Sequence, residues 1–246
     1  MNLLLIDAGN TRIKWAIAAP GAALGAWTLT DAVSHAGLDG AADTWRRAGV
    51  ARAIVSNVAG AAVRERIAQA LPTGIAVEWF ASTLERAGLQ NGYRNPGQLG
   101  CDRFAAAIGA RALAPGQDLI VATCGTATTV DAVTKDGRFI GGMILPGLAL
   151  MAGSLARNTA QLPQVSPGEG PGGAAPPPVF GDNTDDAIVS GVLSAQAGAI
   201  ERACAAHAAT ACIVSGGAAP YIAPVLKFSC LLVDNIVLVG LHAAAA

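Results

Sequence analysis

The stretch Asp7-Ala8-Gly9-Asn10-Thr11-Arg12-Ile13-Lys14 decides the fold, because it is a polar glycine turn between two apolar runs. The runs at 2–7 and 13–18 have the length and the apolar content of buried strands, so the sequence predicts a hairpin. A carboxylate at the end of a buried strand costs free energy unless it binds something. Gly9 lets the backbone approach an anion closely, and the polar residues after it offer hydrogen-bond donors. The turn is typical of a phosphate site with an acid for Mg²⁺, although an Asx turn in a tight hairpin requires the same residue types.

A second turn of the same kind lies halfway along the chain. Leu119-Ile120-Val121-Ala122 is a continuous apolar run that leads through Thr123-Cys124-Gly125-Thr126-Ala127-Thr128-Thr129 into a further strand. This order of strand, glycine turn and strand matches that of residues 3–18. It predicts an internal duplication with halves at 1–116 and 117–246. The alternative is that any β-rich protein contains two such hairpins.

The rest of the chain predicts an α/β protein, because helical and strand-like apolar patterns alternate. We expect helices at 39–48, 63–71, 99–113 and 184–207, and further strands at 53–56, 213–215 and 231–233. We interpret 139–156 as a buried turn followed by a helix, since glycines and Pro146 interrupt it. Residues 166–178, which read SPGEGPGGAAPPP, are predicted to form a mobile loop without helix or strand.

The composition excludes several classes of protein. The chain of 246 residues has 16 basic and 17 acidic side chains, a formal net charge of −1. Only 13% of its residues are charged and 52% are apolar, which excludes a disordered chain. A near-zero charge without a polybasic run argues against a nucleic-acid partner, and the N-terminus lacks the positive region of a secretory signal. Five cysteines without a CxxC pair are typical of a reducing compartment, so we expect a cytoplasmic protein. We also expect a small-molecule partner and no membrane role.

Residues 91–103, which read NGYRNPGQLGCDR, lead from turn residues to an Asp-Arg pair at a predicted helix start. Asp102 could accept a proton from a substrate hydroxyl, and Arg103 could hold a carboxylate or a transferred phosphate. The structural alternative is an acid that stabilises the helix N-terminus, next to a surface ion pair.

Two glycine turns of the second predicted half could complete a nucleotide site. The turn from Gly125 to Thr129 is rich in hydroxyl groups and could face the same phosphates as the first turn. Gly216-Gly217 follows a predicted strand, so an adenine ring could pack against its bare backbone. Each turn alone has an ordinary structural explanation. Together the three turns describe a cleft between two similar halves that binds one nucleotide.

Several motifs taken together resemble those of the type III pantothenate kinases, a family that includes proteins named Bvg accessory factor. They follow in order along nearly the whole chain: Asp7-x-Gly9-Asn10-Thr11-x-x-Lys14, Gly100-x-Asp102-Arg103, Gly125-Thr126-Ala127-Thr128-Thr129, Gly141-Gly142-x-Ile144-x-Pro146-Gly147, Asn158-Thr159-Ala160-x-Leu162-Pro163, Gly181-x-Asn183-Thr184 and Ser190-Gly191. The resemblance implies the α/β fold of the actin-like and sugar-kinase-like (ASKHA) proteins, with two RNase-H-like halves. It also implies ATP-dependent phosphorylation of pantothenate to 4'-phosphopantothenate, the first step of coenzyme A biosynthesis, in a homodimer whose interface forms part of the substrate site.

The resemblance implies a role for each residue that matches a motif. Asp102 would be the general base. ATP with Mg²⁺ would bind at Asp7, Ala8, Gly9, Asn10, Thr11, Arg12, Ile13, Lys14 and Thr126. Pantothenate would contact Tyr93, Gly100, Cys101, Asp102, Arg103 and Thr184.

One position departs from the family. The family usually has an aspartate two residues before the second phosphate glycine, where the carboxylate ligates a monovalent cation, K⁺ or NH₄⁺. This chain has Thr123 there. A hydroxyl or carbonyl oxygen can still ligate K⁺, but with less charge, so we expect the cation requirement to be weakened or relocated.

Two alternative functions remain open. A regulatory protein could keep the fold without catalysis, as the accessory-factor name suggests, although the intact Asp7, Asp102 and Arg103 count against it. Another kinase or phosphatase of the superfamily would share the ATP turns, but it would not need the segments at 100–103 and 158–163.

Overall fold

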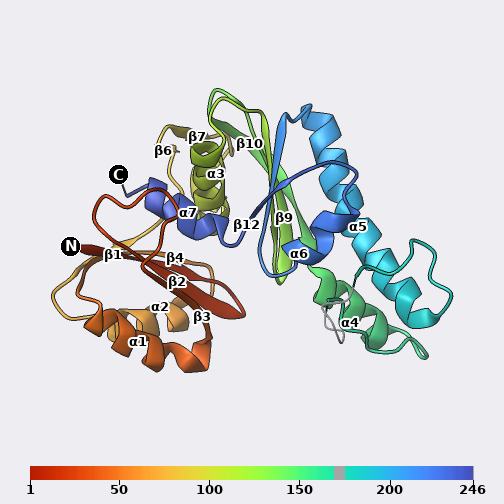
Figure 1. Cartoon of the computed structure of the whole chain (residues 1–246), viewed down its shortest axis with the longest axis horizontal. Helices are drawn as coiled ribbons and strands as arrows, with labels where there is room; N and C mark the ends of the chain where they lie inside the picture. Colours follow the sequence, from red (N-terminus) through yellow and green to blue (C-terminus); the bar gives the residue numbers. More distant parts are fainter. Residues whose placement is uncertain (169–174, 246) are drawn as a thin grey trace. The chain divides into compact units, whose positions relative to one another are not determined.

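The computed structural model describes residues 1–168 and 175–245, which form two compact units (Figure 1). The first unit contains Met1–Leu113, Gly137–Phe139 and Ile236–Ala246. The second contains Ala114–Asp136 and Ile140–Asn235. Each unit consists of a β-sheet with helices packed against it.

The sheet of the first unit has the strand order β3-β2-β1-β4-β5. β1 pairs antiparallel with β2 and parallel with β4, so β1 and β4 end at the same edge of the sheet. This edge carries the first glycine turn. The five strands are β1 (Asn2–Ala8), β2 (Arg12–Ala18), β3 (Leu29–Ser34), β4 (Val50–Asn57) and β5 (Ala76–Trp79).

Four helices cover this sheet, with α1 and α2 on one face and α3 and α7 on the other (Figure 1). Their bounds are α1 (Leu38–Arg47), α2 (Ala61–Ala70), α3 (Cys101–Leu113) and α7 (Ile236–Ala243). Trp15 of β2 and Trp45 of α1 meet edge to face in the core, with ring centroids 6.0 Å apart. α3 and α7 pack backbone against backbone, because a Cβ atom on Gly109 would lie only 2.7 Å from the backbone nitrogen of Gly240. α7 therefore belongs to the first unit. The division predicted from the sequence places the residues of α7 in the second half, 117–246, and that division stays a prediction.

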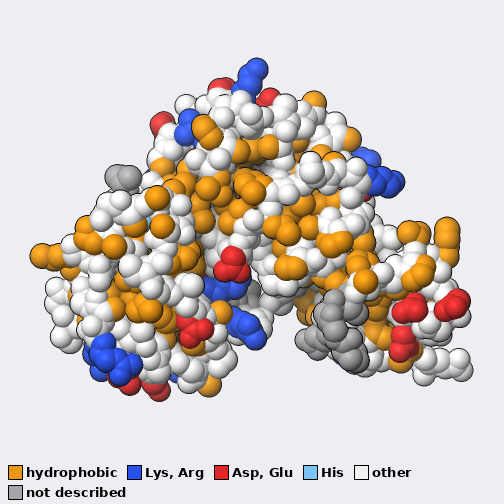
Figure 2. Space-filling view, viewed as in Figure 1, with side chains coloured by type: hydrophobic (Ala, Val, Ile, Leu, Met, Phe, Trp, Pro, Cys, Tyr) orange, Lys and Arg blue, Asp and Glu red, His pale blue; other side chains and the backbone are white. Residues whose placement is uncertain are grey.

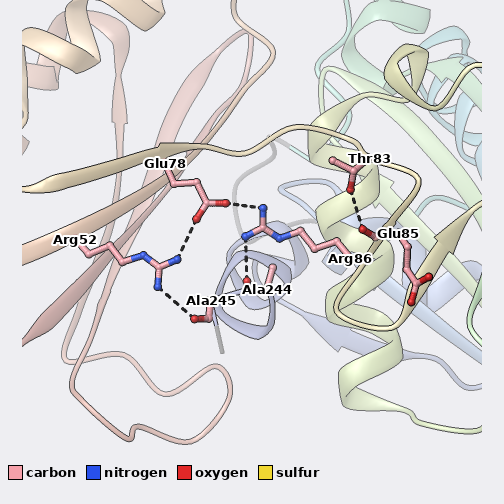
Figure 3. A network of polar contacts seen from close by, with 7 residues as sticks. All are labelled: Arg52, Glu78, Thr83, Glu85, Arg86, Ala244 and Ala245. Atoms are coloured by element: carbon pink, nitrogen blue, oxygen red, sulfur yellow. Dashed lines mark hydrogen bonds and ion pairs between the residues drawn. The ribbon is translucent and has the colours of Figure 1, made fainter.

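A network of charged side chains connects β4 and β5 of the first unit to the residues that follow α7 (Figure 3). Glu78 of β5 accepts a hydrogen bond from Arg52 at 3.0 Å and forms an ion pair with Arg86. Arg52 and Arg86 also donate to the backbone carbonyls of Ala245 and Ala244, at 3.3 and 3.0 Å. The hydrogen bond from Arg86 is the main reason why the pKa of Glu78 lies below its ordinary value. The network thus ties β4 and β5 to the residues that follow α7.

The second unit repeats the strand order of the first, as β10-β9-β8-β11-β12. β8 pairs antiparallel with β9 and parallel with β11, as β1 does with β2 and β4. This repetition agrees with the duplication that the two glycine turns predict. The strands are β8 (Leu119–Cys124), β9 (Ala127–Val133), β10 (Arg138–Pro146), β11 (Ala211–Ser215) and β12 (Leu231–Val233), and the helices are α4 (Leu148–Asn158), α5 (Thr184–His207) and α6 (Ala219–Ile222).

The first two residues of β10, Arg138 and Phe139, belong to the first unit. There they pair parallel with β7 (Leu89–Asn91), with Phe139 opposite Asn91. β7 in turn pairs antiparallel with β6 (Glu85–Arg86). Short 3-10 turns at His35–Gly37, Pro96–Gln98 and Ala223–Val225 complete the described secondary structure.

Most of the predicted elements are confirmed, including the hairpin β1–β2, the helices α1, α2 and α3, and α5 at its predicted bounds. The interpretation of 139–156 is wrong in its first part, because Arg138–Pro146 is the strand β10 and the helix begins at Leu148. Gly141 and Gly142 indicate a turn in isolation, but pairing with β9 keeps this segment extended. β3 was not predicted because its side chains are almost all exposed, so it has no alternating apolar pattern.

Three other expectations concern the loop, the membrane and the cysteines. Residues 166–168 and 175–178 form neither helix nor strand, as predicted, whereas 169–174 lie outside the described residues. In the part of the chain that the structure describes, no helix has both the length and the apolar content needed to cross a membrane. All five cysteines carry free thiols, and Cys124 and Cys212 are buried.

Candidate active site

The first glycine turn joins β1 to β2 and presents polar side chains to solvent. The backbone N–H of Gly9 donates to the carbonyl of Arg12 at 3.0 Å, and His35 Nε2 lies 2.9 Å from the Gly9 carbonyl oxygen. Asp7 is half-buried at the end of β1, whereas Asn10, Thr11 and Arg12 are exposed. Lys14, another predicted nucleotide-binding residue, is half-buried. Ala8 and Ile13 are buried and lie opposite each other in the hairpin, so they can offer only backbone groups to a ligand.

Asp102 lies in the first turn of α3, where its carboxylate receives a short backbone hydrogen bond. Its Oδ1 atom accepts from the N–H of Arg103 at 2.8 Å. A Cβ atom on Gly100 would lie 2.6 Å from that same oxygen, so glycine at this position leaves room for the carboxylate. Burial raises the pKa of Asp102, although the N–H and the positive charge of Arg103 act in the opposite direction. A raised pKa makes the carboxylate a better proton acceptor.

Arg103 is 7% exposed and is enclosed by aromatic rings. Its Nη1 atom donates to the Tyr93 hydroxyl at 2.8 Å. Its guanidinium lies 5.7 Å from the ring centroid of Tyr93 and 5.8 Å from that of Phe139. The two rings meet edge to face at 5.7 Å. The guanidinium is therefore fixed in orientation, which suits recognition of a carboxylate or phosphate.

The turn before α3 determines where Tyr93 lies. Asn91 Oδ1 accepts from the Tyr93 N–H at 3.1 Å, and Asn91 Nδ2 donates to the carbonyl of Pro96 at 3.1 Å. Gly92 donates its N–H to the Phe139 carbonyl at 2.9 Å, and a Cβ atom on Gly92 would overlap that carbonyl. Asn91, Gly92 and Phe139 thus support the site, although the sequence interpretation assigned none of them a role.

The first turn and the start of α3 meet at the carboxyl ends of β1 and β4. Asp7 lies opposite Ser56 in the β1–β4 register. Ser56 Oγ lies 3.4 Å from Cys101 Sγ, which also donates to the Asn57 carbonyl at 3.7 Å. Cys101 directly precedes Asp102 in the chain. The first unit therefore brings the Asp7 turn and the Asp102-Arg103 pair to one edge of its sheet, where ligands of α/β sheets usually bind.

In the second unit, two of the predicted nucleotide turns line one cavity. It has a volume of about 440 Å³, and both Gly125 and Gly217 line it. Gly216 requires a glycine, because its φ is +95° and a Cβ atom would lie 2.5 Å from the Cys124 carbonyl oxygen. The exposed Thr126 lies in the turn beside Gly125, and its carbonyl accepts the N–H of Gly147 at 2.9 Å.

Thr184, a predicted pantothenate contact, is the first residue of α5 and lies at a different place in the second unit. It lines a cavity of about 630 Å³ between α4 and α5. The remaining lining residues are mostly apolar and include Leu150, Leu155 and Ile188. Thr184 thus lines the 630 Å³ cavity, whereas Thr126 lies next to Gly125, which lines the 440 Å³ cavity of the same unit.

The acidic residues of the site could bind a magnesium ion whose other ligands come mainly from the nucleotide phosphates. Among the described residues, no group of three or more His, Cys, Asp or Glu side chains could enclose a metal ion. Mg²⁺ usually takes one or two carboxylates and completes its ligand sphere with water and substrate phosphates. The carboxylate of Asp7 beside a phosphate-type turn satisfies that requirement.

Comparison with known proteins identifies the family. A sequence model of the type III pantothenate kinases matches residues 3–206. This chain belongs to that family. Type III pantothenate kinases from Herminiimonas arsenicoxydans and Janthinobacterium sp. (strain Marseille) are 52% and 53% identical to it, and each match covers 99% of this chain and 97% of the relative.

Solved structures show the same fold at low sequence identity. A Campylobacter jejuni protein assigned to the Baf family of transcriptional activators superimposes with a TM-score of 0.61 at 20% identity, covering 97% of this chain and 95% of that one. A glucokinase from an Antarctic psychrotroph superimposes with a TM-score of 0.51 at 14% identity, covering 98% of each chain. At these identities the likeness concerns the fold alone. It confirms the predicted actin-like and sugar-kinase-like architecture.

Proposed function

We propose that this pantothenate kinase transfers the γ-phosphate of ATP to the primary hydroxyl of pantothenate, with Asp102 as the general base. The observation that carries the proposal is the pairing of a half-buried carboxylate with a fixed guanidinium at the start of α3. The product is 4'-phosphopantothenate, the first intermediate of coenzyme A biosynthesis. The curated relatives are named as kinases, so the regulatory alternative is not favoured.

Asp102 acts as proton acceptor at the substrate hydroxyl. A primary alcohol is a weak acid, so its proton leaves only as the bond to phosphorus forms. The carboxylate must be ionised to accept it, and its raised pKa increases its affinity for that proton. Phosphoryl transfer otherwise depends on position and charge neutralisation, which the rest of the site supplies.

Arg103 binds the carboxylate of pantothenate. The substrate is an anion, and this chain has a net charge of −1, so a local cation is needed to attract it. Tyr93 and Phe139 fix the guanidinium before the substrate arrives, which reduces the entropy lost on binding. Gly100 and Cys101 offer backbone groups at the same helix start. Thr184, at the start of α5, stays a predicted pantothenate contact.

ATP binds at the first glycine turn. Asp7 ligates Mg²⁺, which neutralises phosphate charge when it is bound with the nucleotide. The backbone of Ala8, Gly9 and Ile13 and the side chains of Asn10, Thr11, Arg12 and Lys14 contact the phosphates. Thr126 lies in the second glycine turn, whose neighbour Gly125 lines the 440 Å³ cavity, and it stays a predicted nucleotide contact.

A monovalent cation binds beside Thr123, in place of the site that the family builds with aspartate. Thr123 lies opposite Thr129 in the β8–β9 hairpin. The hydroxyl oxygen of Thr129 is buried and has no hydrogen-bond partner among the described residues. A buried hydroxyl without a partner is costly, and ligation of K⁺ or NH₄⁺ would satisfy it. Because these ligands are neutral, we expect weak cation affinity.

The chain acts as a homodimer through the face that α4 and the start of α5 form. Apolar side chains gather there beside acidic ones (Figure 2). Leu150 of α4 is 42% exposed and lines the 630 Å³ cavity that contains Thr184. A second copy would bury this apolar surface and bring its own residues to Thr184. Light scattering should give a dimer for wild type and a monomer for Leu150→Arg; a monomeric wild-type enzyme with full turnover would contradict the dimer.

The activity is tested directly with purified protein, ATP, Mg²⁺ and pantothenate in Na⁺, K⁺ or NH₄⁺ salts. We expect mass spectrometry to detect 4'-phosphopantothenate together with stoichiometric ADP. Turnover in K⁺ or NH₄⁺ but not in Na⁺ would support the cation site, whereas equal turnover in all three salts would remove it. Folded protein that forms no product in any salt would overturn the proposed function.

A further inference from the structure

His35 contacts the first glycine turn through a hydrogen bond that the proposed mechanism does not use. Its Nε2 atom lies 2.9 Å from the carbonyl oxygen of Gly9. A carbonyl oxygen can only accept a hydrogen bond, so Nε2 carries the hydrogen and donates it. Both residues belong to the first unit and both are half-buried. The turn is therefore attached to a side chain that comes from outside the β1–β2 hairpin.

The pairing of β2 with β3 brings His35 to the turn. Arg12, the first residue of β2, lies opposite Ser34, the last residue of β3. His35 comes directly after Ser34 and begins a 3-10 turn, in which Ser34 Oγ accepts the N–H of Gly37 at 3.3 Å. Leu38, which follows, is 1% exposed and packs into the core of the first unit. The backbone at His35 is thus held by the sheet before it and by the core after it.

The hydrogen bond from His35 sets the direction of the backbone N–H of Asn10. The Gly9 carbonyl and the Asn10 N–H belong to one peptide group, which is planar and, like every peptide group that the structure describes, trans. In a trans peptide group the C=O and N–H bonds point in opposite directions, so a carbonyl directed at His35 directs the N–H away from it. Asn10 itself is exposed, which leaves its N–H accessible to a ligand.

The peptide group after Gly9 needs such a contact, because glycine restricts the backbone very little. If this group turned over, its carbonyl oxygen would replace the N–H and repel a phosphate. The peptide group before it is already held at both ends. The N–H of Gly9 donates to the Arg12 carbonyl at 3.0 Å, and the Ala8 carbonyl accepts the N–H of Val58 at 3.0 Å. His35 extends this anchoring to the next peptide group.

We propose that His35 is a positioning residue for ATP, because its hydrogen bond to the Gly9 carbonyl keeps the Asn10 N–H directed at the nucleotide phosphates. The inference rests on the proposed binding of ATP at the first glycine turn. His35 acts through the backbone of that turn and takes no part in proton transfer, which the proposed mechanism assigns to Asp102. It therefore affects the affinity for nucleotide and leaves the affinity for pantothenate unchanged.

The experiment measures two dissociation constants of the full-length protein by calorimetry, one for the non-hydrolysable β,γ-imido analogue of ATP with Mg²⁺ and one for pantothenate. His35→Ala should weaken binding of the ATP analogue about 3- to 10-fold, the loss expected for one hydrogen bond, and leave pantothenate binding unchanged. His35→Gln should restore most of the affinity, because the glutamine amide places an N–H donor close to the position of Nε2.

His207 provides a matched control in the second unit. Its Nε2 atom lies 3.0 Å from the backbone carbonyl oxygen of Val133, and its side chain is also half-buried. His207→Ala removes the same kind of contact at a place away from the first glycine turn. It should bind the ATP analogue as the wild-type protein does.

The outcomes separate this inference from the proposed function. Wild-type affinity for the analogue in His35→Ala would overturn the inference, and so would equal weakening of analogue and pantothenate binding. A His35→Gln protein as weak as His35→Ala would assign the effect to lost ring packing and overturn it too. If His35→Ala does not fold, His35→Asn replaces it, because its shorter amide does not reach the carbonyl. A wild-type protein that binds no analogue would instead overturn the proposed ATP site, and this inference with it.

Discussion

Arg103 donates a hydrogen bond to the Tyr93 hydroxyl at 2.8 Å and lies over the Tyr93 ring, so the two side chains form one rigid unit at the start of α3. Phe139 borders the guanidinium from the beginning of β10. Because an immobilised cation loses little entropy when it binds an anion, this arrangement explains how a chain with few charges can recognise an anionic substrate.

Phe139→Leu should raise the KM for pantothenate about 5- to 10-fold and leave the KM for ATP unchanged. Loss of the ring removes a cation–π contact of about 1 kcal/mol and frees the Arg103 side chain. Steady-state kinetics with each substrate varied in turn measures the effect. Phe80→Leu is the matched control, because Phe80 is also buried in the same unit but contacts Phe104 and Arg86 rather than Arg103. Equal KM changes in both variants would indicate a general loss of packing instead.

Asp7→Asn should impair the use of Mg·ATP and leave pantothenate affinity intact. The amide removes the negative charge that Mg²⁺ requires but keeps the shape of the side chain. Turnover at varied Mg²⁺ concentration and pantothenate binding by calorimetry separate the two effects. Asp31→Asn makes the same chemical change on the exposed strand β3 and should behave as wild type. Unchanged Mg²⁺ dependence in Asp7→Asn would remove Asp7 from the metal site.

Asp102→Asn should raise the melting temperature at neutral pH. The pKa of Asp102 is raised in the folded protein by burial, so stability is lost as the pH rises from the ordinary pKa through the folded value, and the full cost remains above it. Below the ordinary pKa of 3.8 the acid is protonated in both states and the cost is absent. The advantage of the variant should therefore grow between the ordinary and the folded pKa and then stay constant, and calorimetry across the pH range measures it. A variant that is less stable than wild type at neutral pH would contradict this sign.

Glu78→Gln should lower stability at neutral pH by about 0.5–1 kcal/mol, since the pair is partly exposed. The pKa of Glu78 is lowered in the folded protein, so its contribution is present above the ordinary value of 4.5 and is lost as the pH falls through the folded value. Denaturant unfolding at two pH values tests this. Glu85→Gln, which lies outside the Glu78 ion pairs, is the control; an equal loss in both would show that the network contributes nothing specific.

The sequence could identify those site residues whose role is indicated by their immediate neighbours in the chain. Asp7 follows a buried strand within a glycine turn, and Asp102 begins a helix beside Arg103, so each is visible within a few positions. Phe139 could not be found in this way. It reaches Arg103 only through the pairing of β10 with β7, a contact between residues distant in sequence, and the glycines after it indicate a turn.

Long-range packing also determines which unit contains α7. The predicted division places α7 in its second half because α7 follows that half in the chain, and this division stays a prediction. The place of α7 against α3 depends on Gly109 and Gly240, which allow two helix backbones to touch. Neither glycine signals its partner locally, so only the folded chain shows the contact.

The turnover of Asp102→Asn at saturating ATP and pantothenate tests the central claim most directly. If Asp102 is the general base, kcat should fall by about 10²- to 10⁴-fold, while the dissociation constant of pantothenate changes little. A folded Asp102→Asn enzyme with kcat within about twofold of wild type would contradict the assignment of the base.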